Sequence, residues 1–104
     1  MKSMAGAQWV GTEDDAIIAQ IDISGAEIVA LGGRIERSDS ELGSLDLAIF
    51  ALENGKVISL SRTEGNPVPG YVLILRGHDY AGVLDQFLTE SGLGRERVLI
   101  ELRS

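Results

Sequence analysis

Apolar and polar residues alternate along several stretches of the chain, which is typical of strands that bury one face. The pattern predicts six strands, at residues 16–23, 27–35, 45–52, 57–63, 71–76 and 97–102. Residues 71–76 are apolar on both faces, so we expect this strand to be central in the sheet. The pair Gly32-Gly33 falls inside the second predicted strand, where it indicates a bulge or a bend.

The dipeptide Asn54-Gly55 favours a two-residue type I′ turn, because both residues tolerate positive φ. In the resulting hairpin Leu52 faces Val57. One face then carries the residues expected in the core, which are Leu45, Leu47, Ile49, Ala51, Ile58 and Leu60. The other face carries an apolar spot of Phe50, Leu52 and Val57, which we expect to be an interface or to be covered by Trp9 from an N-terminal arm.

The hydrophobic period changes to that of a helix near residue 79. The apolar stripe consists of Tyr80, Val83, Leu84, Phe87 and Leu88. It predicts a helix over 79–91, with Asp79 as its N-cap and with Gly92 or Gly94 ending it in the left-handed conformation.

These elements predict an α+β fold, with a mainly antiparallel six-stranded sheet and one amphipathic helix packed on one face. The order is five strands, one helix and one strand, and the final strand–helix–strand segment favours a parallel crossover. Residues 36–44 and 64–70 are expected to be loops. Residues 1–12 are expected to form a flexible arm and residues 13–104 a single domain.

Charge narrows the possible partners. The chain has 16 acidic and 9 basic residues, and its formal net charge is −7. This charge disfavours nucleic acids and anionic membranes and suits a protein with a basic surface. The candidate partner-binding residues form an acidic group in the first part of the chain: Glu13, Asp14, Asp15, Asp39 and Glu41.

Little in the sequence points to catalysis. The chain has no cysteine and one histidine, which excludes thiolate metal sites, a cysteine nucleophile and multi-histidine metal sites. We therefore predict no metal and no cofactor. His78 and Asp79 are adjacent, but no G-x-S-x-G motif supplies a nucleophile for them. Without a targeting segment or an apolar run of membrane-spanning length, we expect a cytoplasmic protein.

Three hypotheses follow. The first is a non-catalytic protein-binding module, in the form of an acidic inhibitor or immunity protein that neutralises a basic partner such as a toxin. The second is a homodimer joined through the Phe50, Leu52 and Val57 spot, or through an edge strand, with Trp9 as a further contact. The third is a small enzyme or ligand-binding domain with a cleft near His78.

Overall fold

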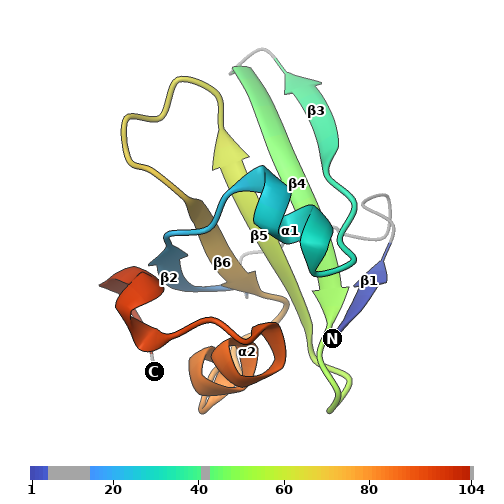
Figure 1. The fold of residues 1–104 in the computed structure, drawn as a ribbon, viewed down its shortest axis with the longest axis vertical. Coiled ribbons are helices and arrows are strands. Elements are labelled where there is room, and N and C mark those ends of the chain that lie inside the picture. The colour runs from blue at the N-terminus through green and yellow to red at the C-terminus, as the bar shows by residue number, and fades with distance from the viewer. Residues whose placement is uncertain (5–14, 41–42, 104) are drawn as a thin grey trace.

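Seven strands form one mostly antiparallel sheet in the computed structural model of the chain, which describes residues 1–4, 15–40 and 43–103 (Figure 1). Within that part of the chain the strands are β1 (Lys2–Met4), β2 (Ala16–Ile21), β3 (Glu36–Ser40), β4 (Gly43–Ala51), β5 (Val57–Thr63), β6 (Tyr71–Leu75) and β7 (Val98–Glu101). The helices are α1 (Gly25–Ala30) and α2 (Val83–Ser91), with a short 3-10 turn η2 (Arg95–Arg97) before β7. The α+β class is therefore confirmed.

The spatial order of the strands is β1-β4-β5-β6-β2-β7, and β3 also pairs with β4. Both β6 and β7 run antiparallel to β2, which lies between them. These two strands are therefore parallel to each other, and α2 connects them as the sequence predicts. Within the described residues, β7 pairs only with β2 and is an edge of the sheet.

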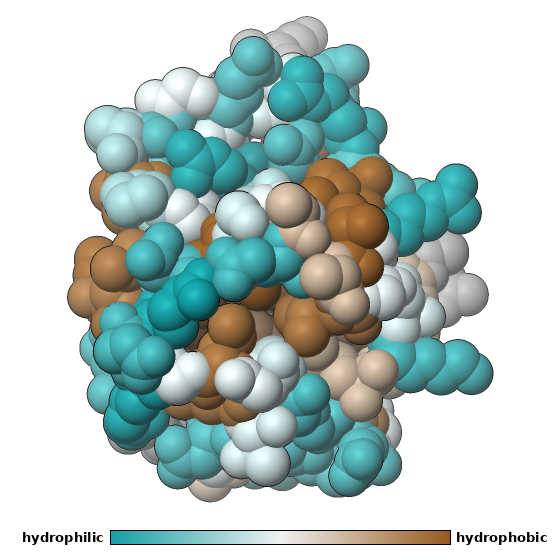
Figure 2. Space-filling view, viewed as in Figure 1, coloured by the Kyte–Doolittle hydropathy of each residue, from teal (hydrophilic) through white to brown (hydrophobic). Residues whose placement is uncertain are grey.

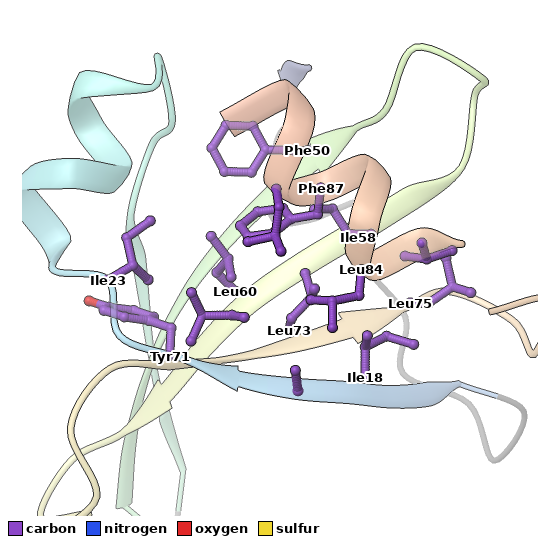
Figure 3. Packing of buried hydrophobic residues seen from close by; sticks show 14 of the residues in the cluster. Ile18, Ile23, Phe50, Ile58, Leu60, Tyr71, Leu73, Leu75, Leu84 and Phe87 are labelled. Carbon is purple, nitrogen blue, oxygen red and sulfur yellow. The ribbon is translucent and has the colours of Figure 1, made fainter. Parts of the chain in front are cut away.

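One face of the sheet carries the hydrophobic core, which both helices cover (Figures 1 and 3). The stripe on α2 is buried as predicted, with Val83, Leu84, Phe87 and Leu88 against the sheet. The sheet contributes the largest share of this core, including Ile18, Ile21, Ala48, Phe50, Leu52, Ile58, Leu60, Tyr71, Leu73 and Leu75. Burial of each large apolar side chain stabilises the fold by about 1.5–3 kcal/mol.

The segment predicted as a strand at 27–35 is wrong, because its first part forms the helix α1. Ser24 and Glu27 form a capping box. The Ser24 hydroxyl accepts the Glu27 N–H at 3.2 Å, and the Glu27 carboxylate accepts the Ser24 N–H at 3.2 Å. Gly32 follows the helix with a φ of +88°, so the glycine pair does not mark a bulge within a strand.

The β4–β5 hairpin is shifted by one residue from the predicted register. Its loop has three residues, Glu53 to Gly55, because Leu52 pairs with Lys56 through a 2.8 Å backbone hydrogen bond. Gly55 donates to the Leu52 carbonyl at 2.9 Å and has a φ of +87°, which is the geometry of a type I turn followed by a left-handed residue. A shift of one residue moves every side chain to the other face of a strand.

The predicted apolar spot of Phe50, Leu52 and Val57 is therefore wrong as a surface feature. Phe50 and Leu52 are buried in the core, and Val57 is half-buried on the opposite face. Ala51, and not Leu52, faces Val57. The predicted core residues of β4, which are Leu45, Leu47, Ile49 and Ala51, lie on the face away from the helices. Ile49 is nevertheless buried on that face, as predicted, with 1% of its surface exposed.

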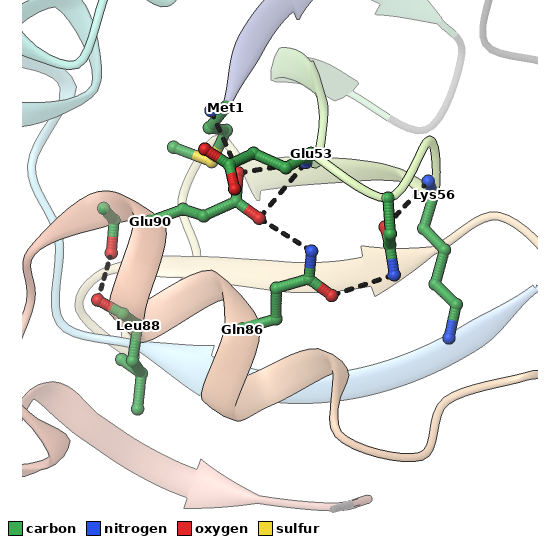
Figure 4. Close-up of polar contacts among 8 residues, drawn as sticks. Met1, Glu53, Lys56, Gln86, Leu88 and Glu90 are labelled. Atoms are coloured by element: carbon green, nitrogen blue, oxygen red, sulfur yellow. Dashed lines mark hydrogen bonds and ion pairs between the residues drawn. The ribbon is translucent and has the colours of Figure 1, made fainter.

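Contacts with α2 explain the longer hairpin loop (Figure 4). Both carboxylate oxygens of Glu90 accept the Glu53 N–H at 3.2 Å, and the Asn54 amide donates to Gln86 at 2.9 Å. Glu90 also accepts from the Met1 ammonium at 2.9 Å and from Gln86 at 2.8 Å. These bonds hold the loop against the helix. The turn preference of Asn54-Gly55 is a local property and does not reflect these long-range contacts.

Three further segments differ from the prediction. The helix α2 begins at Val83 after Gly82, whose φ is +74°, so Asp79 is not its N-cap. It ends at Gly92 with a φ of +76°, as predicted. Residues 36–40 are not a loop but the strand β3, which pairs with β4 and is fixed by an Arg37–Asp46 ion pair of 3.0 Å. Lys2–Met4, at the start of the predicted arm, form β1 against β4.

Candidate functional site

The predicted acidic group does not form one surface among the described residues. Glu13, Asp14 and Glu41 lie outside them, as does Trp9. Asp15 directly precedes β2. The strands β2, β6, β5 and β4 pair in that order, and their register places the first residue of β2 at the same end of the sheet as the end of β4. Asp39 faces Ser44 at the start of β4. The two described carboxylates therefore lie at opposite ends of the sheet.

Ion pairs take up many of the charges in the described residues. Arg37, Lys56, Arg95 and Arg97 each contact a carboxylate within 4 Å. Their partners include Asp46, Asp79, Asp85 and Glu27. The charges of these described residues are therefore distributed in separate pairs over the surface.

The side chains of His78 and Asp79 have different surroundings, and no hydrogen bond or ion pair joins these two described residues. The His78 side chain is exposed, and its backbone carbonyl accepts the Tyr80 N–H at 3.0 Å. The Asp79 carboxylate points to Lys56 instead, at 3.5 Å. In the described ranges, no group of three or more histidine or acidic side chains gathers to hold a metal ion.

Exposed apolar side chains gather at the open edge of the sheet. Four of the six large hydrophobic side chains that are exposed among the described residues belong to β2, β7 and the residue after β7: Ile17, Leu99, Ile100 and Leu102. We call this set the β7 edge. Apolar atoms are visible on the side of the molecule where the chain ends (Figures 1 and 2). Leu102 is 59% exposed, and Ile100 is 50% exposed.

A bulge contributes to the exposure of this edge. Ile21 faces Val98, whereas its neighbour Gln20 faces Ile100, so Leu99 is an extra residue in β7. The sequence places Val98, Ile100 and Leu102 on one face, but only Val98 packs against the core. A single inserted residue interrupts the alternation, and the sequence carries no glycine at this position to signal it.

A cleft of about 360 Å³ opens at the other end of β2. Its lining comes from the end of β2, the start of α1, the end of β5 and the loop that leads into β6, namely Asp22, Ile23, Ser24, Gly25, Glu27, Arg62, Pro69, Gly70 and Tyr71. The Tyr71 ring belongs to the core, and its hydroxyl points away from the other core side chains (Figure 3). That oxygen lies 3.5 Å from the position of a Cβ on Gly25.

Tyr71 is the most buried polar side chain of the cleft, with 6% of its surface exposed. Burial raises the pKa of its hydroxyl, the Asp46 carboxylate raises this pKa further, and the Arg62 guanidinium partly opposes both. The phenol is therefore neutral and able to donate at physiological pH. No described residue forms a hydrogen bond with it.

Arg62 is held beside this hydroxyl by the loop. Its Nη1 donates to the Gly70 carbonyl at 2.9 Å and to the Val68 carbonyl at 3.4 Å. It forms no ion pair with a described carboxylate, because its cross-strand neighbour Asp46 is bonded to Arg37. Nε and Nη2 of Arg62 thus keep their donors available.

Two carboxylates lie at the rim of the cleft. Glu27 is paired with Arg97 at 2.6 Å, and this bond is the main reason that the pKa of Glu27 lies below its usual range. Asp22 is exposed, and its backbone carbonyl, not its carboxylate, accepts the Arg97 Nε at 2.6 Å. Asp22 and Arg62 are therefore the two charged groups of the cleft without an ion pair among the described residues.

No local pattern in the sequence marks this cleft. Asp22, Arg62 and Tyr71 come from three separate segments, and no motif connects them. The available signal was the Ser24–Glu27 capping box, which marks the start of a helix immediately after Asp22.

The fold and its two surface features thus define a small α+β domain with an open apolar edge and a polar cleft. Comparisons with protein-family models, with curated proteins and with solved structures found no match. No helix among the described residues has both the length and the apolar character needed to cross a bilayer.

Proposed function

We propose that this chain is a non-catalytic protein-binding domain that docks a partner on the β7 edge. The observation that carries the proposal is that Ile17, Leu99, Ile100 and Leu102 lie around a strand that has one side unpaired among the described residues. Contiguous exposed apolar groups mark binding surfaces more often than scattered ones do.

An edge strand offers a specific way of binding. Its free N–H and C=O groups accept an added strand, while side chains on both faces select the sequence of that strand. Apolar residues in the partner strand would cover Ile100 and Leu102, whose exposure in water is unfavourable. The short length of β7 and its bulge limit the surface, so we expect side-chain contacts to contribute much of the affinity.

We infer that the partner is a basic protein. The net charge of −7 attracts a positively charged surface and speeds its association, and it repels a second copy of the same chain. An acidic inhibitor or immunity protein that neutralises a basic partner, such as a toxin, fits this description.

The test uses two aspartate substitutions on exposed apolar residues. Leu102→Asp alters the β7 edge, whereas Val29→Asp alters α1 at a similarly exposed position, since the two side chains are 59% and 58% exposed. A partner captured from native lysate is purified, and its affinity for each variant is measured by calorimetry at several salt concentrations. We expect Leu102→Asp to weaken binding at least about tenfold and Val29→Asp to leave it unchanged, with the affinity falling as salt rises.

Equal effects of the two substitutions would contradict the choice of surface. An affinity independent of salt would contradict the basic partner.

A homodimer is the second candidate. One side of β7 is unpaired among the described residues, and the same strand of a second copy is an alternative occupant of that side. Light scattering over a range of protein concentrations separates the two candidates, because a strict monomer at high concentration eliminates the dimer.

A further inference from the structure

We propose that the cleft beside Tyr71 binds a small zwitterion, of the class of free α-amino acids. This proposal goes beyond protein binding at the β7 edge and does not depend on it. The first observation is the Tyr71 hydroxyl, which lines the cleft although only 6% of the surface of Tyr71 is exposed. This hydroxyl has no hydrogen-bond partner among the described residues, and because the oxygen itself keeps access to solvent, an acceptor on a ligand can reach it from the cleft.

The carboxylate of the ligand would face Tyr71 and Arg62. Both side chains are donors, and both line the same cleft. The Arg62 guanidinium is already oriented by the Gly70 and Val68 carbonyls through Nη1, which leaves Nε and Nη2 for an incoming oxygen. A guanidinium and a phenol together suit the two oxygens of a planar carboxylate.

The ammonium group of the ligand would face Asp22. The other charges near the cleft are already balanced, since Glu27 is paired with Arg97 and Asp46 with Arg37. Arg62 and Asp22 remain without an ion pair within 4 Å among the described residues, although Asp22 also interacts with the more distant charge of Arg97. A ligand with one negative and one positive group complements both side chains. A phosphate dianion suits the site poorly, because it would add two negative charges beside Asp22 and Glu27.

The size of the cleft limits the ligand to a small molecule. Its volume of about 360 Å³ lies at the lower end of the range for small-molecule sites. Ile23, Pro69 and the Tyr71 ring provide apolar surface, so we expect an aliphatic side chain to be accepted.

Three probes separate the two charged groups of the ligand. Leucine carries both groups, N-acetylleucine lacks the ammonium, and leucinamide lacks the carboxylate. Binding of each to the full chain is followed by backbone amide shifts in two-dimensional NMR. We expect saturable shifts at cleft residues with leucine below about 10 mM, and weaker binding of the other two probes.

Substitutions then assign each charged group to a side chain. Tyr71→Phe keeps the ring in the core and removes only the hydroxyl. Because this variant loses a hydrogen bond to a charged group, we expect its affinity for leucine and N-acetylleucine to fall about tenfold to one hundredfold. Its affinity for leucinamide, which has no carboxylate, should be unchanged. Asp22→Asn should weaken leucine and leucinamide by about twofold to fivefold and leave N-acetylleucine unchanged. Matched controls are Tyr80→Phe and Asp79→Asn, which lie outside the cleft.

Gly25→Ala tests the cleft without removing a polar group. The added methyl group would lie 3.5 Å from the Tyr71 hydroxyl and 3.2 Å from the end of the Ile35 side chain, which can move. We expect this variant to fold and to bind leucine more weakly than the wild type does.

Selective effects of Tyr71→Phe and Asp22→Asn on the affinities of the three probes would support the proposal. It is overturned if no probe produces saturable shifts at the cleft, or if N-acetylleucine binds as tightly as leucine. The second result would indicate a carboxylate site for a peptide C-terminus or a simple acid. Because these substitutions leave Leu99, Ile100 and Leu102 intact, failure here is distinguishable from failure at the β7 edge.

Discussion

Among the described glycines, Gly70 is the one at which a single added methyl group should be most destabilising. It lies just before β6 with a φ of +87°, and it packs against the end of β2. A Cβ at this position would overlap the carbonyl oxygen of Ile21 and would lie 2.9 Å from its carbonyl carbon. It would also lie 3.2 Å from the Asp22 Cα. All three atoms belong to the backbone, so no side-chain rotation relieves the contact.

Gly65 provides a matched control in the same loop. Its φ is +81°, and a Cβ on it would have no neighbour within 4 Å. Gly65→Ala should therefore cost only the left-handed conformation, about 1–2 kcal/mol. Gly70→Ala carries this cost and must also displace the end of β2 from β6, where Ile21 faces Tyr71. Loss of a backbone hydrogen bond and of core packing raises the total to about 3–5 kcal/mol.

Urea denaturation of the wild type and both variants measures this difference. Domains of this size are stable by about 5–15 kcal/mol, so Gly70→Ala should remain partly or wholly foldable with a much lower midpoint. Equal slopes of the unfolding transitions would show that the free energies are comparable. If the free energies of unfolding of the two variants differ by less than about 1 kcal/mol, the close packing of β2 against Gly70 is not what constrains this position.

Three further substitutions test the core, the first helix and the contact between the hairpin loop and α2. Phe87→Ala should lower the free energy of unfolding by about 3–5 kcal/mol, because the ring is fully buried, and Phe87→Leu should recover much of this loss in thermal denaturation. Ser24→Ala removes one bond of the capping box and should cost about 1 kcal/mol in urea denaturation, with Ser24→Thr close to the wild type. For Glu90, burial raises the pKa, but bonds from the Met1 ammonium, Gln86 and the Glu53 N–H outweigh it, and the pKa lies below 4.5. The ionised carboxylate therefore adds stability above pH 4.5 that is lost as pH falls through the lower folded-state pKa, so Glu90→Gln should be destabilised at pH 7 and approach the wild type in acid. A constant difference across this pH range would contradict the assignment.

Elements with a strong hydrophobic period could be predicted from the sequence. The α2 stripe needs only the spacing of Val83, Leu84, Phe87 and Leu88, and the end of the helix needs only Gly92. The strands β2 and β6 are recognisable because each is rich in branched apolar residues. In these segments local preference and tertiary packing favour the same structure.

The errors arose where tertiary contacts decide between alternatives of similar local energy. The segment after Ser24 contains Ile28 and Val29, which suit a strand, and the capping box was the signal for a helix. The dipeptide Asn54-Gly55 favours a two-residue hairpin loop. In the structure Glu90 on α2 binds the N–H of Glu53, the preceding residue, and the loop includes Glu53 as well. Because register errors reverse the faces of a strand, this single difference moved Phe50 from a predicted interface into the core.

The candidate sites were beyond prediction for a different reason. The β7 edge is exposed because of a bulge and of its place in the strand order, and neither is encoded by a local motif. The cleft assembles Asp22, Arg62 and Tyr71 through the pairing of β2, β5 and β6, so it exists only once the sheet has formed.

Arg97 connects the two candidate sites and restricts how they can be tested. Its side chain donates to the Asp22 carbonyl and to the Glu27 carboxylate at the rim of the cleft, both at 2.6 Å. Its own carbonyl accepts the Asp22 N–H at 2.6 Å, directly before β7. A substitution at Arg97 would therefore disturb the cleft and the edge together, and loss of either binding activity would have two explanations. Tyr71 and Leu102 each contribute to only one of the two sites, so substitutions at these residues can attribute a binding activity to one site.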